Sequence, residues 1–218
     1  MAQLKLESHK VMQLALDMTD IDTALEITDQ VSSCFEILEV GTPLILSEGV
    51  RGIEILRARY PRKTILADMK IADAGDYEAT IAYQAGADLV TVLGVVDFRT
   101  IQGAVAAGKR MDRGVCVDTL NMNYSADFMV QLEKLGVACV LFHAATDGVY
   151  RATTLTDRIS EAAKISDIPL AIAGGITPQN ISSLMNSGAT IFVIGSSVTQ
   201  SSDPLQTAQI IRNQLLGR

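Results

Sequence analysis

Short apolar runs recur along the chain at a nearly constant spacing, and this repeat constrains the fold more than any other feature. The runs are rich in β-branched and aliphatic residues, as buried parallel strands are, and segments with helical spacing separate them. Eight strands alternating with helices predict a single α/β domain, a (β/α)8 TIM barrel, and the regular repeat favours it over a doubly wound open sheet. Successive runs begin 25, 27, 25, 25, 25, 31 and 21 residues apart, at Met12, Ile37, Thr64, Leu89, Gly114, Cys139, Leu170 and Ile191.

Length and charge narrow the class of protein. The 218 residues suffice for one barrel domain, with residues 1–11 as an N-terminal extension and a last helix from Pro204 to Leu216 capped by Asp203. No apolar run reaches the ~18 residues of a membrane span, and residues 1–10 lack the apolar core of a signal peptide. The net charge of −7 argues against nucleic-acid and anionic-membrane partners. We therefore expect a cytoplasmic protein.

The cysteines agree with this location. Cys116 and Cys139 lie inside apolar strands, and Cys34 follows the first predicted helix. We expect three buried thiols here, and neither disulfides nor metal ligands.

Charged side chains close several of the predicted strands. Asp68 and Lys70 directly follow an apolar run, and Asp73 comes three residues later. Alternate residues of a strand point the same way, and the carboxyl ends of barrel strands form the mouth where such enzymes act. An ion-pair cluster that caps the next helix would explain one such acid, but several strands share the pattern. The converging set is Asp17, Glu39, Asp68, Lys70, Asp118 and His143, with Asp73 one turn further.

This concentration of carboxylates predicts a divalent cation. Oxygen ligands with little histidine or thiolate favour Mg²⁺ over Zn²⁺. Glu39 and Asp68, on neighbouring strands, are the expected metal ligands. For Asp17 and Asp118 the alternative, a protonated or simply hydrated carboxyl, stays open.

Glycines follow the seventh and eighth strands. Gly174 and Gly175 come after one run, and Gly195 and Ser196 after the next. Glycines let backbone N–H groups approach an anion, and TIM barrels often bind phosphate in these two loops. The sequence therefore predicts a phosphate-binding site there.

Taken in order, these motifs resemble the orotidine 5′-monophosphate decarboxylase suprafamily, and within it the 3-hexulose-6-phosphate synthase group. The resemblance covers nearly the whole chain from Met12 onward. It is carried by Leu14-Ala15-Leu16-Asp17, Glu39-Val40-Gly41-Thr42-Pro43, Asp68-x-Lys70-x-x-Asp73, Val117-Asp118, His143 and Ala173-Gly174-Gly175.

Specific positions separate the members of this suprafamily. The decarboxylase that names it has lysine at the position of Glu39. Compared with 3-keto-L-gulonate-6-phosphate decarboxylases, this chain has Asp118 in place of glutamate, Thr146 in place of arginine and Ala173 in place of threonine. All three favour the synthase. One departure is Ala145, since synthases usually have His-x-Gly there, and we expect its methyl group to reshape the loop.

The resemblance implies a mechanism. Mg²⁺ held by Glu39 and Asp68 would bind oxygens of ribulose 5-phosphate and favour an enediolate, which adds reversibly to formaldehyde. Lys70 would stabilise the developing oxyanion and His143 would transfer the proton. Asp118, together with Asp17, would hold sugar hydroxyls or water. In this family the residue matching Asp73 reaches the site of a partner subunit, which implies a homodimer with shared active sites.

Three other functions remain as alternatives. The nearest is 3-keto-L-gulonate-6-phosphate decarboxylase. A phosphopentose epimerase would want two histidines on its metal, but His9 precedes the first strand and leaves only His143. A non-catalytic phosphate-binding barrel would need the glycine loops without Lys70 or the acids.

Overall fold

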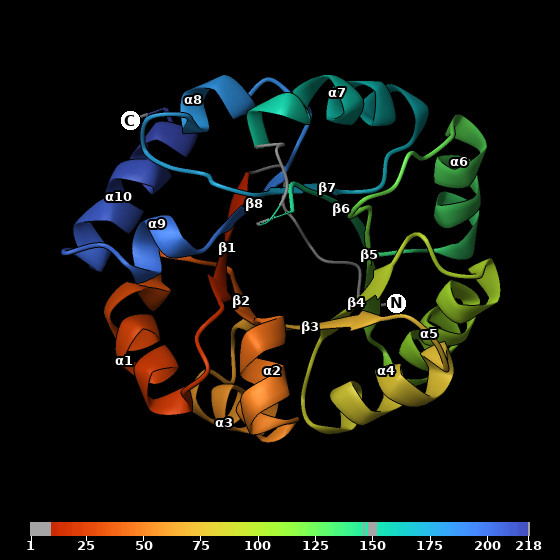
Figure 1. Ribbon diagram of the computed structural model, residues 1–218, viewed down its shortest axis with the longest axis horizontal. Coiled ribbons are helices and arrows are strands. Elements are labelled where there is room, and N and C mark those ends of the chain that lie inside the picture. The colour runs from red at the N-terminus through yellow and green to blue at the C-terminus, as the bar shows by residue number, and fades with distance from the viewer. Residues whose placement is uncertain (1–9, 146, 148–151, 218) are drawn as a thin grey trace.

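The structure is a closed barrel of eight parallel strands paired in chain order, with β1 next to both β2 and β8. It is a computed structural model that describes residues 10–145, 147 and 152–217. Figure 1 shows the helices as an outer ring around the strands. The prediction of a (β/α)8 TIM barrel is confirmed. The strands are β1 Val11–Leu16, β2 Ile37–Val40, β3 Thr64–Ile71, β4 Leu89–Leu93, β5 Gly114–Asp118, β6 Cys139–His143, β7 Leu170–Ala173 and β8 Ile191–Ile194.

Helices connect the strands and follow the last one. Two lie between β2 and β3, and two follow β8. The α-helices are α1 Ile21–Val31, α2 Thr42–Glu48, α3 Arg51–Arg59, α4 Gly75–Gln84, α5 Phe98–Met111, α6 Ala126–Leu135, α7 Thr156–Ile165, α8 Ile181–Leu184, α9 Ser196–Thr199 and α10 Pro204–Leu215, with short 3-10 helices η1 Ser32–Cys34 and η2 Ala152–Thr154.

The predicted boundaries are close to the observed ones. Seven strands begin at the expected residue, and β1 begins at Val11, one residue early. Val11 therefore belongs to the barrel and not to the predicted extension, of which residues 1–9 lie outside the described part. The Asp203 side chain accepts a hydrogen bond from the Gln206 N–H, as an N-cap does, and α10 ends at Leu215, one residue before the predicted end.

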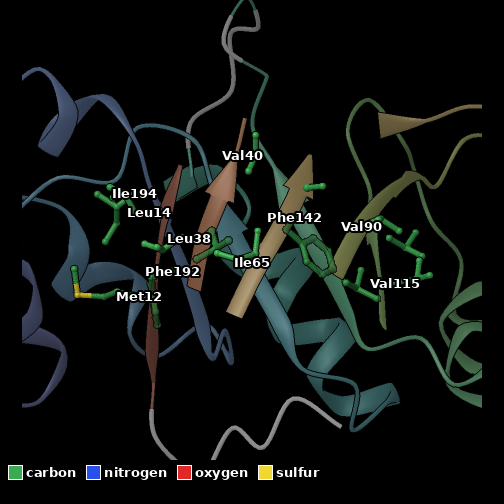
Figure 2. Packing of buried hydrophobic residues seen from close by; sticks show 14 of the residues in the cluster. Met12, Leu14, Leu38, Val40, Ile65, Val90, Val115, Phe142, Phe192 and Ile194 are labelled. Carbon is green, nitrogen blue, oxygen red and sulfur yellow. The ribbon is translucent and has the colours of Figure 1, made fainter. Parts of the chain in front are cut away.

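Strand alternation divides the buried side chains into two layers. One set, including Leu14, Leu38 and Phe192, belongs to the large cluster in which strands pack on helices (Figure 2). A smaller cluster, including Ala15, Cys116 and Cys139, fills the barrel interior. Burial of each large aliphatic side chain stabilises the fold by about 1.5–3 kcal/mol. The apolar floor thus supports the polar residues at the strand ends.

The three cysteines are free and buried, as predicted. Cys116 and Cys139 are register partners on β5 and β6. Within the described residues, no helix combines the length and apolarity needed to cross a bilayer. The cytoplasmic location stays a prediction.

Candidate active site

Strand β3 carries the centre of the site. The Lys70 ammonium lies 2.5 Å from Asp68 Oδ2, and both side chains face the barrel mouth. Lys70 has a φ of 45°, in the left-handed region that non-glycine residues rarely occupy. The pairing register between β3 and β4 also shifts between Ala67 and Ile71. Backbone strain and bulges of this kind concentrate at functional sites.

Asp68 is buried, and both of its carboxylate oxygens accept hydrogen bonds. Thr42 Oγ1 donates to its Oδ2 at 2.7 Å, and Thr91 Oγ1 donates to its Oδ1 at 2.8 Å. Burial alone would raise the pKa of this carboxyl, but the charge and hydrogen bond of Lys70, together with the hydrogen bonds from the two threonines, outweigh burial and lower the pKa. Asp68 is therefore held as a carboxylate.

Asp118 joins Lys70 to His143. Its fully buried carboxylate places Oδ2 3.2 Å from His143 Nδ1 and 3.7 Å from Lys70 Nζ, while Leu120 N–H donates to Oδ1. An ionised carboxylate can only accept, so in the tautomer that makes this hydrogen bond the imidazole proton lies on Nδ1 and Nε2 is left for another partner. Of the two alternatives left open for Asp118, a simply hydrated carboxyl does not hold, because the side chain is excluded from solvent.

Glu39 supplies a second buried carboxyl beside Asp68. Its Oε2 accepts a hydrogen bond from Gln13 Nε2 at 2.7 Å. Burial, and then the charge of Asp68, raise the pKa of Glu39 well above its ordinary value. A bound cation would relieve that repulsion.

The donor chemistry of Glu39 and Asp68 fits Mg²⁺. The described residues contain no cluster of three or more histidine, cysteine or acidic side chains arranged to hold a metal ion. Mg²⁺ commonly uses one or two protein carboxylates and completes its octahedron with water and substrate oxygens. Two neighbouring carboxyls are therefore enough, and the magnesium site stays a prediction.

Asp17 lies between two glycines at the end of β1. A Cβ on Gly41 would come within 2.2 Å of Asp17 Oδ1, and one on Gly195 within 3.7 Å of Oδ2. Although Asp17 is exposed, the partial loss of solvent around its carboxyl, followed by the charge of Asp68, raises its pKa. Gly41 thus makes room for a carboxyl that faces the same cluster, whereas the Gly195 distance is an ordinary contact.

Asp73 stands apart from the other predicted residues. Its exposed side chain accepts a hydrogen bond from the Ala74 N–H at 2.7 Å, and Ala74 has a φ of 47°. None of the described interactions links it to Lys70 or Asp118 of the same subunit. The structure therefore does not bring Asp73 into the cluster within one chain.

The first of the two predicted phosphate loops adopts a conformation that needs glycine. Gly174 and Gly175 have φ values of 114° and 70°. Gly195 precedes the short helix α9, whose first residue, Ser196, is exposed. In the described part of the chain the buried Ser197 hydroxyl has no hydrogen-bond partner. Both loops lie at the carboxyl ends of adjacent strands, where the phosphate was expected.

Three polar residues near the cluster were not singled out from the sequence. Gln13 contacts Glu39, while Thr42 and Thr91 contact Asp68. Thr42 belongs to a quoted motif, and Gln13 is polar within an apolar run. Thr91 has no comparable signal, because threonine is common in strands.

Comparison with known proteins places this barrel in a family. The sequence profile of the orotidine 5′-phosphate decarboxylase / HUMPS family matches residues 10–211. The chain belongs to this family. Among its relatives is a protein of Mycobacterium gastri named 3-hexulose-6-phosphate synthase, 36% identical over 92% of this chain and 97% of the relative. A protein of the same name from Methylomonas aminofaciens is 34% identical over 90% of this chain and 94% of its own length.

Solved structures agree with this membership. The crystal structure of 3-hexulose-6-phosphate synthase from Salmonella typhimurium superimposes with a TM-score of 0.89 at 34% identity, covering 95% of this chain and 99% of that one. A crystal structure of a Streptococcus mutans protein called KGPDC has a TM-score of 0.89 at 21% identity and covers 95% and 98% of the two chains. The second likeness shows the fold alone.

Two of the positions at which this chain differs from related proteins, Ala145 and Thr146, lie in the loop after β6. Thr146 lies outside the described residues, as do residues 148–151. Ala144 is buried, and its Cβ would lie 2.7 Å from a Cβ added to Gly174. The expected effect of Ala145 on this loop stays a prediction.

Proposed function

We propose that this protein is a 3-hexulose-6-phosphate synthase, a lyase of the aldehyde-lyase type. It joins ribulose 5-phosphate to formaldehyde in a reversible, Mg²⁺-dependent aldol condensation through an enediolate of the sugar. The observation that carries the proposal is the contact of Asp118 with both Lys70 and His143 at the barrel mouth. Relatives of that name, similar over nearly the whole chain, support it.

Glu39 and Asp68 would hold the Mg²⁺ ion. When bound, it supplies a Lewis acid that polarises the carbonyl oxygen of the sugar and its neighbouring hydroxyl. The Thr42 and Thr91 hydroxyls fix the Asp68 carboxylate, and Gln13 fixes Glu39. These partners matter because groups that orient metal ligands tune both affinity and geometry.

Lys70 would stabilise the negative charge that develops in the reaction, and His143 would transfer the proton. Lys70 places its ammonium beside the oxyanion that develops as the C–H bond breaks. His143, held through Nδ1 by Asp118, takes that proton on Nε2 and leaves the electron pair on carbon. This carbon then attacks formaldehyde, whose oxygen becomes a hydroxyl on protonation.

The substrate would be held at both ends. Asp17 hydrogen-bonds sugar hydroxyls, while the loops of Gly174 and Gly175 and of Gly195 and Ser196 bind the phosphate. Gly195 lies near Asp17, so a phosphate bound by Gly195 and Ser196 would be close to the sugar hydroxyls that Asp17 holds.

Asp73 would complete the site of a second subunit in a homodimer. Its side chain is exposed and makes no described contact with the cluster of its own chain. Tyr77, in the first turn of α4, is 71% exposed, and Leu46 of α2 is 81% exposed. A partner surface that covered these two side chains would remove apolar area from water, which favours association.

The proposal is tested by a side-by-side assay. Purified protein with Mg²⁺ should convert ribulose 5-phosphate and formaldehyde to 3-hexulose 6-phosphate, with little decarboxylation of 3-keto-L-gulonate 6-phosphate. A chelator should abolish turnover, and added Mg²⁺ should restore it. The reverse substrate preference would make the decarboxylase the better assignment, and full turnover without metal would remove the role given to Glu39 and Asp68.

A further inference from the structure

Thr91 lies opposite the bulge that carries the Asp68–Lys70 pair. Ala67 pairs with Val90 and Ile71 pairs with Val92, so Thr91 is the single β4 residue that faces Asp68, Met69 and Lys70 of β3. The two additional β3 residues preserve the alternation of side chains. Asp68 and Lys70 therefore both face the barrel mouth, although the backbone ladder is interrupted between them.

One hydroxyl group joins the two halves of this pair. Thr91 Oγ1 donates to Asp68 Oδ1 at 2.8 Å and accepts from the Lys70 backbone N–H at 2.8 Å. The threonine is fully buried. Its hydroxyl therefore replaces the strand partner that the bulge takes from Lys70, and it fixes the rotation of the Asp68 carboxylate at the same time.

The backbone of Lys70 needs such a tether. Its φ of 45° is unfavourable for a residue with a side chain, so surrounding contacts must hold it there. Threonine is suited to this task because its β-branch restricts χ1 more than serine does.

We infer that Thr91 is a positioning residue for the proposed reaction: its hydroxyl sets the Asp68 carboxylate and the Lys70 backbone in one geometry, so that metal ligand and ammonium act together on the sugar. This inference rests on the proposed function, since it assigns Thr91 through the roles of Asp68 and Lys70. Loss of the hydroxyl leaves the N–H of Lys70 and one Asp68 oxygen without this partner.

Two substitutions separate positioning from packing. Thr91→Val keeps the shape and removes both hydrogen bonds, whereas Thr91→Ser keeps the hydroxyl. Thr28→Val is the matched control, because Thr28 is equally buried and its hydroxyl only donates to the Ala24 carbonyl within α1. At saturating Mg²⁺ and formaldehyde, we expect Thr91→Val to lower kcat about 10–100-fold, as loss of a group that orients a metal ligand does.

The pattern across variants identifies the role. KM for ribulose 5-phosphate should change little in Thr91→Val, because the lost interaction matters in the transition state. Thr91→Ser should keep most of kcat, and Thr28→Val should keep wild-type kcat. Wild-type kcat in folded Thr91→Val would overturn the inference. Should that variant not fold, Thr91→Cys, with its weak thiol donor, should turn over more slowly than Thr91→Ser, and equal rates would overturn it.

A second readout does not depend on turnover. Hydrogen exchange of the Lys70 amide should accelerate in Thr91→Val and stay slow in Thr91→Ser and Thr28→Val. Unchanged exchange in Thr91→Val would overturn the inference even if wild-type protein converted neither sugar phosphate. That inactivity would by itself reject the proposed function, so the two failures are distinguishable.

Discussion

Lys70 illustrates how much the chemistry of one residue depends on its neighbours. Burial alone would lower the pKa of its ammonium, but the charge and hydrogen bond of Asp68, together with the charges of Asp118 and Glu39, outweigh burial and raise the pKa. The side chain therefore stays charged next to a carboxylate that also stays charged. A positive charge fixed in a site that is partly shielded from water stabilises a developing oxyanion.

At this scale we predict that Lys70→Ala lowers kcat about 10²–10³-fold, the usual effect of removing one such charge stabiliser. The fold should persist, because Lys70 is partly exposed and its loss removes no core packing. Steady-state kinetics with circular dichroism would measure both. Lys109→Ala, an exposed change at the end of α5, is the control, and near-normal kcat in folded Lys70→Ala would contradict the role.

Glu39 predicts a pH dependence. Burial and the charge of Asp68 raise its pKa well above 4.5 in the folded state. Between these two values the folded protein binds a proton that the unfolded chain has lost, so the free energy of unfolding falls as pH rises through this window. Metal-free Glu39→Gln should therefore be more stable than wild type above the window, because it removes the group whose ionisation the fold disfavours.

Thermal melts in chelator, from below pH 4.5 to neutral pH, would measure this difference. Glu54→Gln, an exposed change on α3, is the control. Added Mg²⁺ should raise the stability of the wild-type protein, because the ion binds its folded state. A difference between Glu39→Gln and wild type that does not vary with pH would show that Glu39 does not titrate in this window.

At the scale of elements, the loop from β3 to α4 is held by close helix packing. Gly75 begins α4, and a Cβ there would lie 1.9 Å from the Thr100 carbonyl oxygen of α5. This contact fixes the start of α4 just after Asp73. The motif from Asp68 to Asp73 therefore lies between a strained strand end and a helix whose first turn packs directly against α5.

Gly75→Ala should consequently destabilise the protein by about 1–3 kcal/mol, the typical cost of overpacking. Urea unfolding would measure it. Gly52→Ala is the matched control, because Gly52 lies within α3 and an added Cβ would meet its nearest atom at 3.5 Å, an ordinary contact. Equal stability of the two variants would contradict a tight contact between α4 and α5.

At the scale of the whole molecule, we predict that the active unit is a dimer. If Asp73 completes the partner's site, inactive Lys70→Ala and inactive Asp73→Ala subunits should restore activity when mixed. Random exchange in a twofold dimer would leave about one quarter of the sites intact. Sedimentation would verify the dimer and the exchange. Activity no greater than that of the separate variants, after verified exchange, would contradict sharing.

The sequence by itself determined the barrel fold and which strand-end residues lie at the barrel mouth. Seven strand starts were predicted to the residue, because buried parallel strands need continuous apolar runs and the helices between them keep the repeat regular. The positions of these apolar runs also placed Glu39, Asp68, Asp118 and His143 at the carboxyl ends of their strands. Local periodicity is enough for such predictions, since it is encoded in neighbouring residues.

Only the tertiary structure decided which of these groups touch. The bulge opposite Thr91, the contact of Asp118 with His143 and the space that Gly41 leaves for Asp17 each depend on residues more than 20 positions apart. The separation of Asp73 from the cluster was likewise decided by the path of the loop. Contacts between strands depend on barrel closure and register, and no local pattern in the chain encodes these distances.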